Sequence, residues 1–84
     1  MSQRKATLFR MKLATHECPY GLLARRMLED TGYQIDEHLL TTREEVDAFQ
    51  AEHGVSTTPQ IFIDGERIGG SEELANYLEK VPQD

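Results

Sequence analysis

The sequence predicts an α/β protein with a four-stranded mixed sheet and three helices, in the order βαβαββα. Short apolar runs typical of strands alternate with segments whose apolar residues recur at helical spacing. Asp64-Gly65 separates two apolar runs, which is the strongest short signal for a β-hairpin. The chain has 84 residues, a length that predicts one domain over residues 1–84.

The first half of the chain is typical of a strand–helix–strand unit. Residues 6–11 form an apolar-rich run that predicts a strand, and residues 33–39 alternate in the manner of a second strand. Between them, residues 19–31 predict a helix that begins with Pro19 and ends before Gly32. Its expected buried face consists of Tyr20, Leu23, Ala24, Met27 and Leu28. The two strands should be parallel, with a right-handed crossover.

The second half predicts a helix, a hairpin and a closing helix. Thr42 followed by Glu45 is a capping-box pattern, and Gly54 suits the end of that helix. Its buried side carries Val46 and Phe49. Residues 60–63 and 66–68 then predict two antiparallel strands. Ser71 can cap the last helix, whose inward residues are Leu74, Tyr77, Leu78 and Val81.

Composition and charge exclude several function classes. The net charge of −6 argues against nucleic-acid binding, which needs clustered Lys and Arg, and indicates a soluble protein. No apolar run approaches the length that spans a bilayer, so no membrane partner is expected. Residues 1–15 have no continuous apolar stretch typical of a signal peptide, and we therefore expect a cytoplasmic protein.

The chain has one cysteine, Cys18, which excludes an internal disulfide and an all-cysteine zinc site. Cys18 lies between a polar loop and the start of the first helix, where free N–H groups and the helix dipole stabilise a thiolate. This position favours a reactive thiol over a buried structural one. His16 suggests a Cys–His hydrolase, but no orienting group or oxyanion site accompanies it. His38 and His53 are interpreted as surface residues, and no metal site is expected.

Two later segments are candidate ligand sites. Pro59 is either a strand boundary or a cis-proline that presents the backbone of the preceding residue to a partner. Gly69 and Gly70 allow close approach of a ligand to the backbone, and the helix start after them suits a carboxylate. Because Glu72 and Glu73 offer negative charge to an ammonium, this segment fits the end of an α-amino acid. Plain helix capping is the alternative.

Together these segments resemble the glutaredoxins. The matching pieces are Cys18-Pro19-Tyr20 at a helix start, the run from Thr57 to Gly65, and the run from Ile68 to Leu74. The resemblance covers nearly the whole chain, with the pieces in the expected order and at the expected spacing. It implies a thioredoxin-like fold, with glutathione as co-substrate.

The resemblance also implies residue roles. Cys18 would be the nucleophile, Tyr20 would flank the site, Thr58 would pair its backbone with the cysteinyl part of glutathione, and Pro59 would be the cis-proline. The γ-glutamyl end of glutathione would be held by Gly70, Ser71 and Glu72. Lys12 would attract the glycine carboxylate, with Arg10 and Arg43 as alternatives because five residues separate Lys12 from Cys18.

One departure from the family decides the expected mechanism. Many glutaredoxins have a second cysteine where this chain has Gly21, so a one-cysteine route remains, in which Cys18 takes a glutathionyl group and free glutathione removes it. Glutathionylated proteins or small disulfides are the expected substrates, and a monomer is expected. The alternatives are a [2Fe–2S] cluster held between two protomers with two glutathiones, against which Pro19 argues, and a regulatory domain without chemistry.

Overall fold

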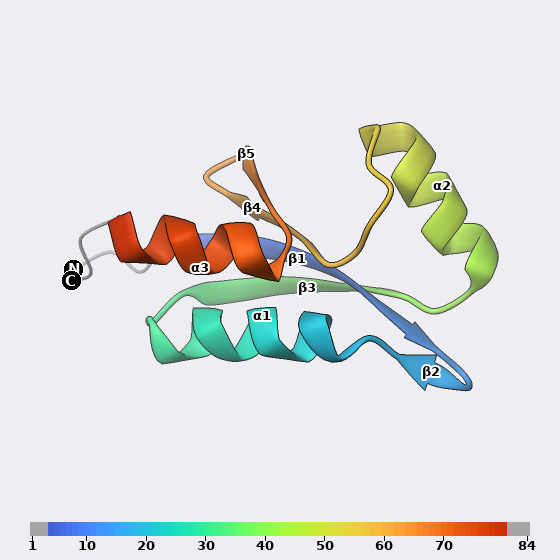
Figure 1. Ribbon diagram of the computed structural model, residues 1–84, viewed down its shortest axis with the longest axis horizontal. Coiled ribbons are helices and arrows are strands. Elements are labelled where there is room, and N and C mark those ends of the chain that lie inside the picture. The colour runs from blue at the N-terminus through green and yellow to red at the C-terminus, as the bar shows by residue number, and fades with distance from the viewer. Residues whose placement is uncertain (1–3, 81–84) are drawn as a thin grey trace.

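A computed structural model describes residues 4–80 and confirms the α/β architecture (Figure 1). The expected Val81 contact lies outside the described residues. The elements in chain order are β1 (Lys5–Leu13), β2 (His16–Glu17), α1 (Pro19–Asp30), β3 (Gln34–Leu40), α2 (Arg43–His53), β4 (Gln60–Ile63), β5 (Glu66–Gly69) and α3 (Ser71–Lys80).

The sheet is built around β1. It pairs in parallel with β3 and antiparallel with β4, and β5 continues the sheet beyond β4. The sheet has five strands rather than four, because β1 extends past Met11 to Leu13 and the chain turns back as the two-residue β2. Lys12 lies opposite Glu17 in this additional hairpin. The loop before Cys18 is therefore an ordered extension of the sheet.

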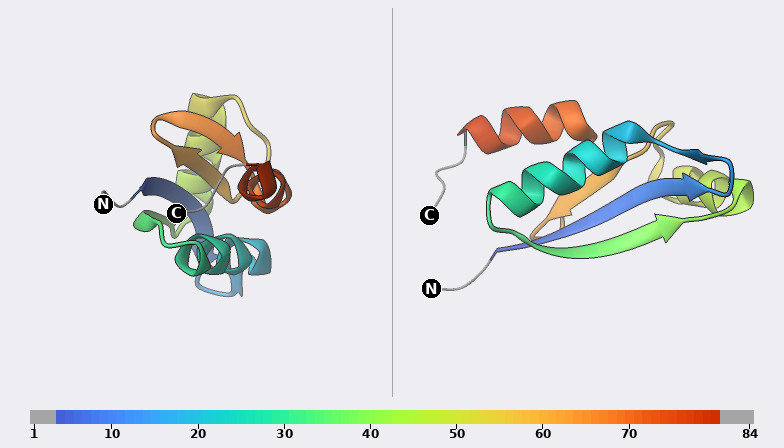
Figure 2. Two further views of the ribbon diagram at one scale, coloured as in Figure 1. Left: turned by 90° about the vertical axis from the view of Figure 1, so that its left-hand side faces the viewer. Right: turned by 90° about the horizontal axis from the view of Figure 1, so that it is seen from below.

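The helices form two layers on the sheet. In the views of Figure 2, α1 and α3 lie side by side over one face, and α2 lies near the far end of β1 and β3. Alternation along β1 sends Ala6 and Leu8 toward α1 and α3. These residues begin the main core, whose buried members are Ala6, Leu8, Ala24, Leu28, Tyr33, Ile61, Ile63 and Leu74.

A second, aromatic cluster joins α2 to the other face of the sheet. The ring of Phe9 lies 4.7 Å from those of His38 and Phe49, measured between centroids. His53 also packs against Phe49, at 4.5 Å. His38 is exposed, as expected, and the His53 side chain is 28% exposed, so it reaches the surface while one side of its ring packs in the cluster.

The buried face of α1 differs from the expected one. Tyr20 and Leu23 are 61% and 49% exposed, so their assignment to the core is wrong. The buried residues are Gly21, Ala24 and Leu28. Because Gly21 and Ala24 are small, α1 approaches β1 closely at these two residues, and Tyr20 and Leu23 lie outside the contact.

Local signals for turns and caps are confirmed. Thr42 accepts a hydrogen bond from the Glu45 N–H at 3.1 Å at the start of α2, and Gly54 ends that helix in the left-handed conformation. Asp64 and Gly65 both have positive φ, at 53° and 82°, as a tight hairpin turn requires. The hairpin fixes the approach of the chain to the start of α3.

Candidate functional site

Cys18 occupies the N-cap position, immediately before the first residue of α1. Its backbone is extended, and its side chain makes no capping hydrogen bond to the helix. The strand β2 leads directly into Cys18, and the Cys18 N–H donates to the Met11 carbonyl at 3.5 Å. The thiol is partly exposed, and the first turn of α1 holds no acidic side chain. The early N–H groups of α1 therefore lack a side-chain acceptor from this position.

A groove of about 320 Å³ lies beside the start of α1. Its size falls in the range of small-molecule sites. It brings together six of the predicted residues and adds two from the same segments, and its lining consists of Tyr20, Thr57, Thr58, Pro59, Gly70, Ser71, Glu72 and Glu73. Cys18 does not line the groove, but it is two residues from Tyr20, which does. One of the lining residues is a glycine, Gly70, which lets a ligand approach the backbone closely at this point.

Two loop segments meet to form the groove. The Thr58–Pro59 peptide bond is cis, as the resemblance implies. A Cβ placed on Gly70 would lie 3.4 Å from the Pro59 carbonyl oxygen, so the two segments touch here. The buried Gln60 side chain braces the first segment, because its Nε2 donates to the Thr57 carbonyl at 3.0 Å. Thr57 and Gln60 were missed by sequence reasoning, although both flank the Thr58-Pro59 pair.

At the start of α3, one carboxylate bonds the helix backbone and another is exposed at the groove. The Glu73 Oε1 accepts from the Gly70 N–H at 2.8 Å, which commits this carboxylate to the helix start. The first helical hydrogen bond runs from the Leu74 N–H to the Gly70 carbonyl. Gly70 therefore occupies the cap position and Ser71 is the first helical residue, so the expectation that Ser71 caps α3 is wrong. Glu72 is exposed and lines the groove.

None of the three basic candidates lines the groove. Lys12 is exposed and lies opposite Glu17 in the β1–β2 hairpin. Arg43 pairs with Asp47 on α2, at 3.2 Å. Arg10 is only 4% exposed and its guanidinium is already paired. A role for Lys12 in binding a carboxylate stays a prediction.

Arg10 forms an unexpected cluster beneath α1. Its Nη1 lies 2.5 Å from Glu17 Oε2, and its Nε lies 2.5 Å from Glu37 Oε2. Burial alone would lower the pKa of the Arg10 guanidinium, but its hydrogen bonds to Glu37 and Glu17 outweigh burial and raise it. The hydrogen bond from Arg10 lowers the pKa of Glu17. The signal for this cluster was present in the alternation of β1, which places residue 10 on the inward face with residues 6 and 8.

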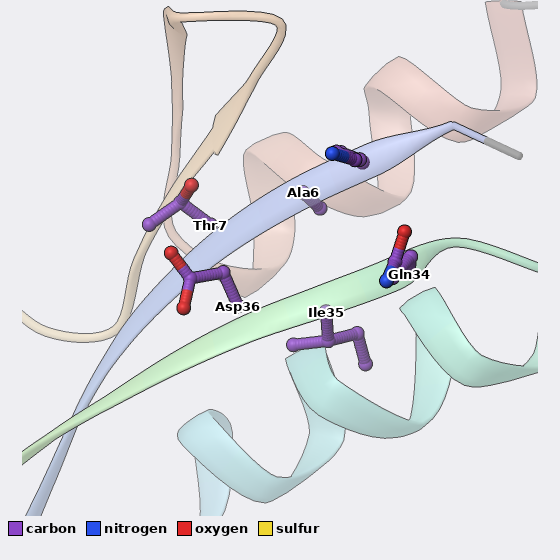
Figure 3. Close-up of a pocket in the computed structure, with 6 residues that line it drawn as sticks. Ala6, Thr7, Gln34, Ile35 and Asp36 are labelled. Atoms are coloured by element: carbon purple, nitrogen blue, oxygen red, sulfur yellow. The ribbon is translucent and has the colours of Figure 1, made fainter.

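A second hollow, of about 350 Å³, lies over the first halves of β1 and β3 (Figure 3). Thr7 and Asp36 are opposite each other in the strand register. The lining is completed by Lys5, Ala6, Gln34 and Ile35. Cys18 lies toward the other end of β1, where its N–H donates to the Met11 carbonyl. The hollow therefore lies away from the thiol, and neither Cys18 nor any residue of α1 lines it.

No group of three or more His, Cys, Asp or Glu residues within residues 4–80 is arranged to hold a metal ion. No helix among the same residues has the length and apolar character needed to cross a membrane.

Comparison with known proteins agrees with this geometry. The Glutaredoxin family model matches residues 6–68. Glutaredoxin 1 of Rickettsia prowazekii is 38% identical over 66 residues, which cover 75% of this chain and 68% of that protein. The hybrid peroxiredoxin hyPrx5 of Haemophilus influenzae is 37% identical over 61 residues, but the match spans only 25% of that longer protein and 73% of this chain.

Solved structures are similar over nearly the whole chain. Glutaredoxin 1 from Francisella tularensis, complexed with cacodylate, has a TM-score of 0.81 at 29% identity, covering 92% of this chain and 94% of that one. A buckwheat glutaredoxin–glutathione complex has a TM-score of 0.74 at 22% identity, covering 90% of this chain and 69% of that one. The family match, the fold and the helix-start thiol agree, and the chain belongs to the glutaredoxin family of thioredoxin-like oxidoreductases.

Proposed function

We propose that this protein reduces glutathione mixed disulfides by a one-cysteine mechanism with Cys18 as the nucleophile. The observation that carries the proposal is the lone thiol at the uncapped start of α1, two residues from a side chain that lines the groove. Glycine occupies the place three residues after the thiol, so a second thiol of this chain cannot take part. Glutathione then has to supply the second thiol.

The proposed reaction has two exchange steps. The Cys18 thiolate attacks the glutathione sulfur of a mixed disulfide, forming a disulfide with glutathione and releasing the substrate thiolate, which takes a proton from solvent. The thiolate of a second glutathione then attacks the glutathione sulfur on Cys18. Oxidised glutathione leaves and the Cys18 thiolate is regenerated. In the net exchange the incoming glutathione thiol is oxidised as it joins the glutathionyl group in a new disulfide. The substrate sulfur is reduced to a thiol, and the glutathionyl group from the mixed disulfide stays at the oxidation level of a disulfide.

The groove is the proposed binding site for the glutathione moiety. The backbone of Thr58, before the cis Pro59, would pair with the cysteinyl residue, and the start of α3 would receive the γ-glutamyl carboxylate at Gly70 and Ser71. Glu72 would face the ammonium, because Glu73 is committed to Gly70. The buckwheat relative that was solved with glutathione supports this choice of ligand. A reducing compartment such as the cytoplasm would supply it.

Turnover of a glutathionylated small disulfide, coupled to glutathione reductase, tests the proposal. The wild-type protein should turn over, and Cys18→Ser should lose activity to the uncatalysed rate, because a serine hydroxyl cannot carry out thiol–disulfide exchange. When free glutathione is withheld, the second exchange cannot occur, and mass spectrometry of the wild-type protein should find one glutathione on Cys18.

Leu22→Ala is the matched control. Leu22 lies on the exposed side of the same helix, at 44% exposure and outside the groove, so this variant should keep wild-type turnover. Equal turnover by Cys18→Ser and the wild type would contradict the proposed mechanism.

A further inference from the structure

We propose that Arg10 maintains the reactivity of Cys18 by neutralising Glu17, the carboxylate that immediately precedes the thiol. Arg10 is a positioning residue in this view, because it acts through Glu17 and does not touch the substrate. The inference rests on the proposed role of Cys18 as the nucleophile. It concerns a residue pair that lies beneath α1 and outside the glutathione groove.

Arg10 is buried and bonds two carboxylates at once, those of Glu17 and Glu37. The Arg10 side chain is 5% exposed, and the two carboxylates bind different nitrogens of its guanidinium. Glu17 comes from β2 and Glu37 from β3, so Arg10 ties the hairpin that precedes the thiol to the sheet. A guanidinium with fixed donors suits this double contact better than a lysine ammonium does. Arg25 also approaches Glu37, at 3.8 Å, but from the exposed side of α1.

The chemical consequence concerns the charge next to the thiol. A negative charge close to a thiol disfavours the thiolate, and the start of a helix favours it. The ordinary pKa of a glutamate, 4.5, already lies well below 7, and the hydrogen bond from Arg10 lowers the pKa of Glu17 further. Glu17 is therefore ionised at neutral pH with or without Arg10. Without Arg10, an unpaired carboxylate would lie one residue from Cys18 and oppose the effect of the helix. Lys12, across the hairpin, contributes a second and weaker positive charge.

Gly21 provides the space for this arrangement. A Cβ on Gly21 would lie 2.9 Å from the Arg10 Cβ and 3.3 Å from its Cδ, so the Arg10 methylene chain runs directly against the helix backbone. A side chain at residue 21 would push Arg10 away from its path to Glu17. The glycine that replaces the family's second cysteine and the buried arginine therefore form one structural unit.

The test is a double-mutant cycle on the rate of Cys18 alkylation by iodoacetamide at pH 7, in which the thiolate displaces iodide to form a thioether. We expect Arg10→Met to slow alkylation about two- to fivefold. In the Glu17→Gln background, the same substitution should cause no slowing. Because alkylation needs no glutathione, the result stands apart from the turnover assay.

Arg25→Met is the matched control, because it removes a cation beside Glu37 without touching Glu17, and it should alkylate at the wild-type rate. Equal slowing by Arg10→Met with and without Glu17, or no slowing at all, would overturn the proposal. Circular dichroism checks folding. Should Arg10→Met be unfolded, Arg10→Gln, which also removes the charge but keeps a hydrogen-bond donor, replaces it in the cycle, and slowing is again expected only when Glu17 is present.

Discussion

At the start of α2, Thr42 accepts a hydrogen bond from the Glu45 N–H, and Glu45 Oε1 accepts from the Thr41 N–H at 2.7 Å and the Thr41 hydroxyl at 2.9 Å. At the start of α1, Cys18 makes no side-chain cap, and no acidic residue follows in the first turn. Both helices have the same positive dipole end, although Pro19 at the first position of α1 has no N–H and the Gly21 N–H donates to the Cys18 carbonyl. At the start of α2 two side chains bond the backbone, whereas the start of α1 has no side-chain cap.

The start of α3 lies between these two cases. Glu73 is committed to the Gly70 N–H, as in a capping box, while Glu72 lines the groove. One helix start thus combines a carboxylate that bonds the backbone with a second that is exposed at the groove. The comparison indicates that the side chain at or after the cap position decides whether a helix start stabilises the fold or serves a site.

Among the substitutions that leave Cys18 in place, the largest expected effect is on substrate binding at α3. Glu72→Gln removes the charge proposed to face the glutathione ammonium, so KM for a glutathionylated substrate should rise about fivefold. The value of kcat should change little, because the contact is remote from the reacting sulfur. Steady-state kinetics measure both. Glu79→Gln removes the same charge from the last turn of α3 and should leave KM unchanged; a rise in KM with this variant too would indicate a general charge effect.

The next prediction concerns the start of α2, which should contribute to stability without affecting turnover. Thr42→Ala should lower the free energy of unfolding by about 1 kcal/mol through loss of the cap, which lowers Tm by about 4–8 °C in a domain of this size. Turnover at 25 °C should not change, because α2 contributes no residue to the groove. Thermal melting and the coupled assay measure the two quantities.

Cys18→Ser supplies the reverse case for the same comparison. Serine is a good N-cap residue, so this variant should melt at or above the wild-type temperature while losing turnover. A drop in Tm for Cys18→Ser, as large as that for Thr42→Ala, would contradict the view that α1 begins without a cap.

The smallest effect is the pH dependence of the α2 cap. Hydrogen bonds from the Thr41 N–H and hydroxyl lower the pKa of Glu45 below its usual 4.5. The ionised form is therefore favoured by folding, and its stabilisation is present above the unfolded pKa and lost as pH falls through the folded value. Glu45→Gln should reduce the loss of stability between pH 6 and pH 3, measured as urea midpoints. Glu44→Gln, one residue earlier, should retain the wild-type acid loss.

Local signals were sufficient to predict most of the fold. Asp64-Gly65 predicted the hairpin because few residue pairs tolerate positive φ at two successive positions. Thr42 with Glu45 predicted the start of α2 because the capping contact spans only three residues. β2 was missed because Ala14 and Thr15 carry no turn signal and its pairing depends on β1. The exposure of Tyr20 and Leu23 depends on how closely α1 packs on the sheet, which periodicity alone does not contain.

The site was predictable to the extent that it follows the backbone. Thr58, Pro59 and Gly70 come together because they end or begin elements whose order was predicted. The place of Lys12 was not predictable, since the register of the β1–β2 hairpin turns it toward Glu17. The Arg10 cluster was also missed. It depends on the unpredicted β1–β2 hairpin for Glu17, on the distant strand β3 for Glu37, and on a helix residue without a side chain above it.

The contact between Gly21 and Arg10 also limits how this chain can change by single mutations. A cysteine at residue 21 would place its Cβ 2.9 Å from the Arg10 Cβ, so that substitution alone would strain the join between α1 and β1. A workable two-thiol descendant therefore requires a compensating change on β1 before or together with the new cysteine. At the level of the motif the one-thiol and two-thiol forms differ at one position, but on this backbone a new cysteine also needs the space that the Arg10 side chain occupies.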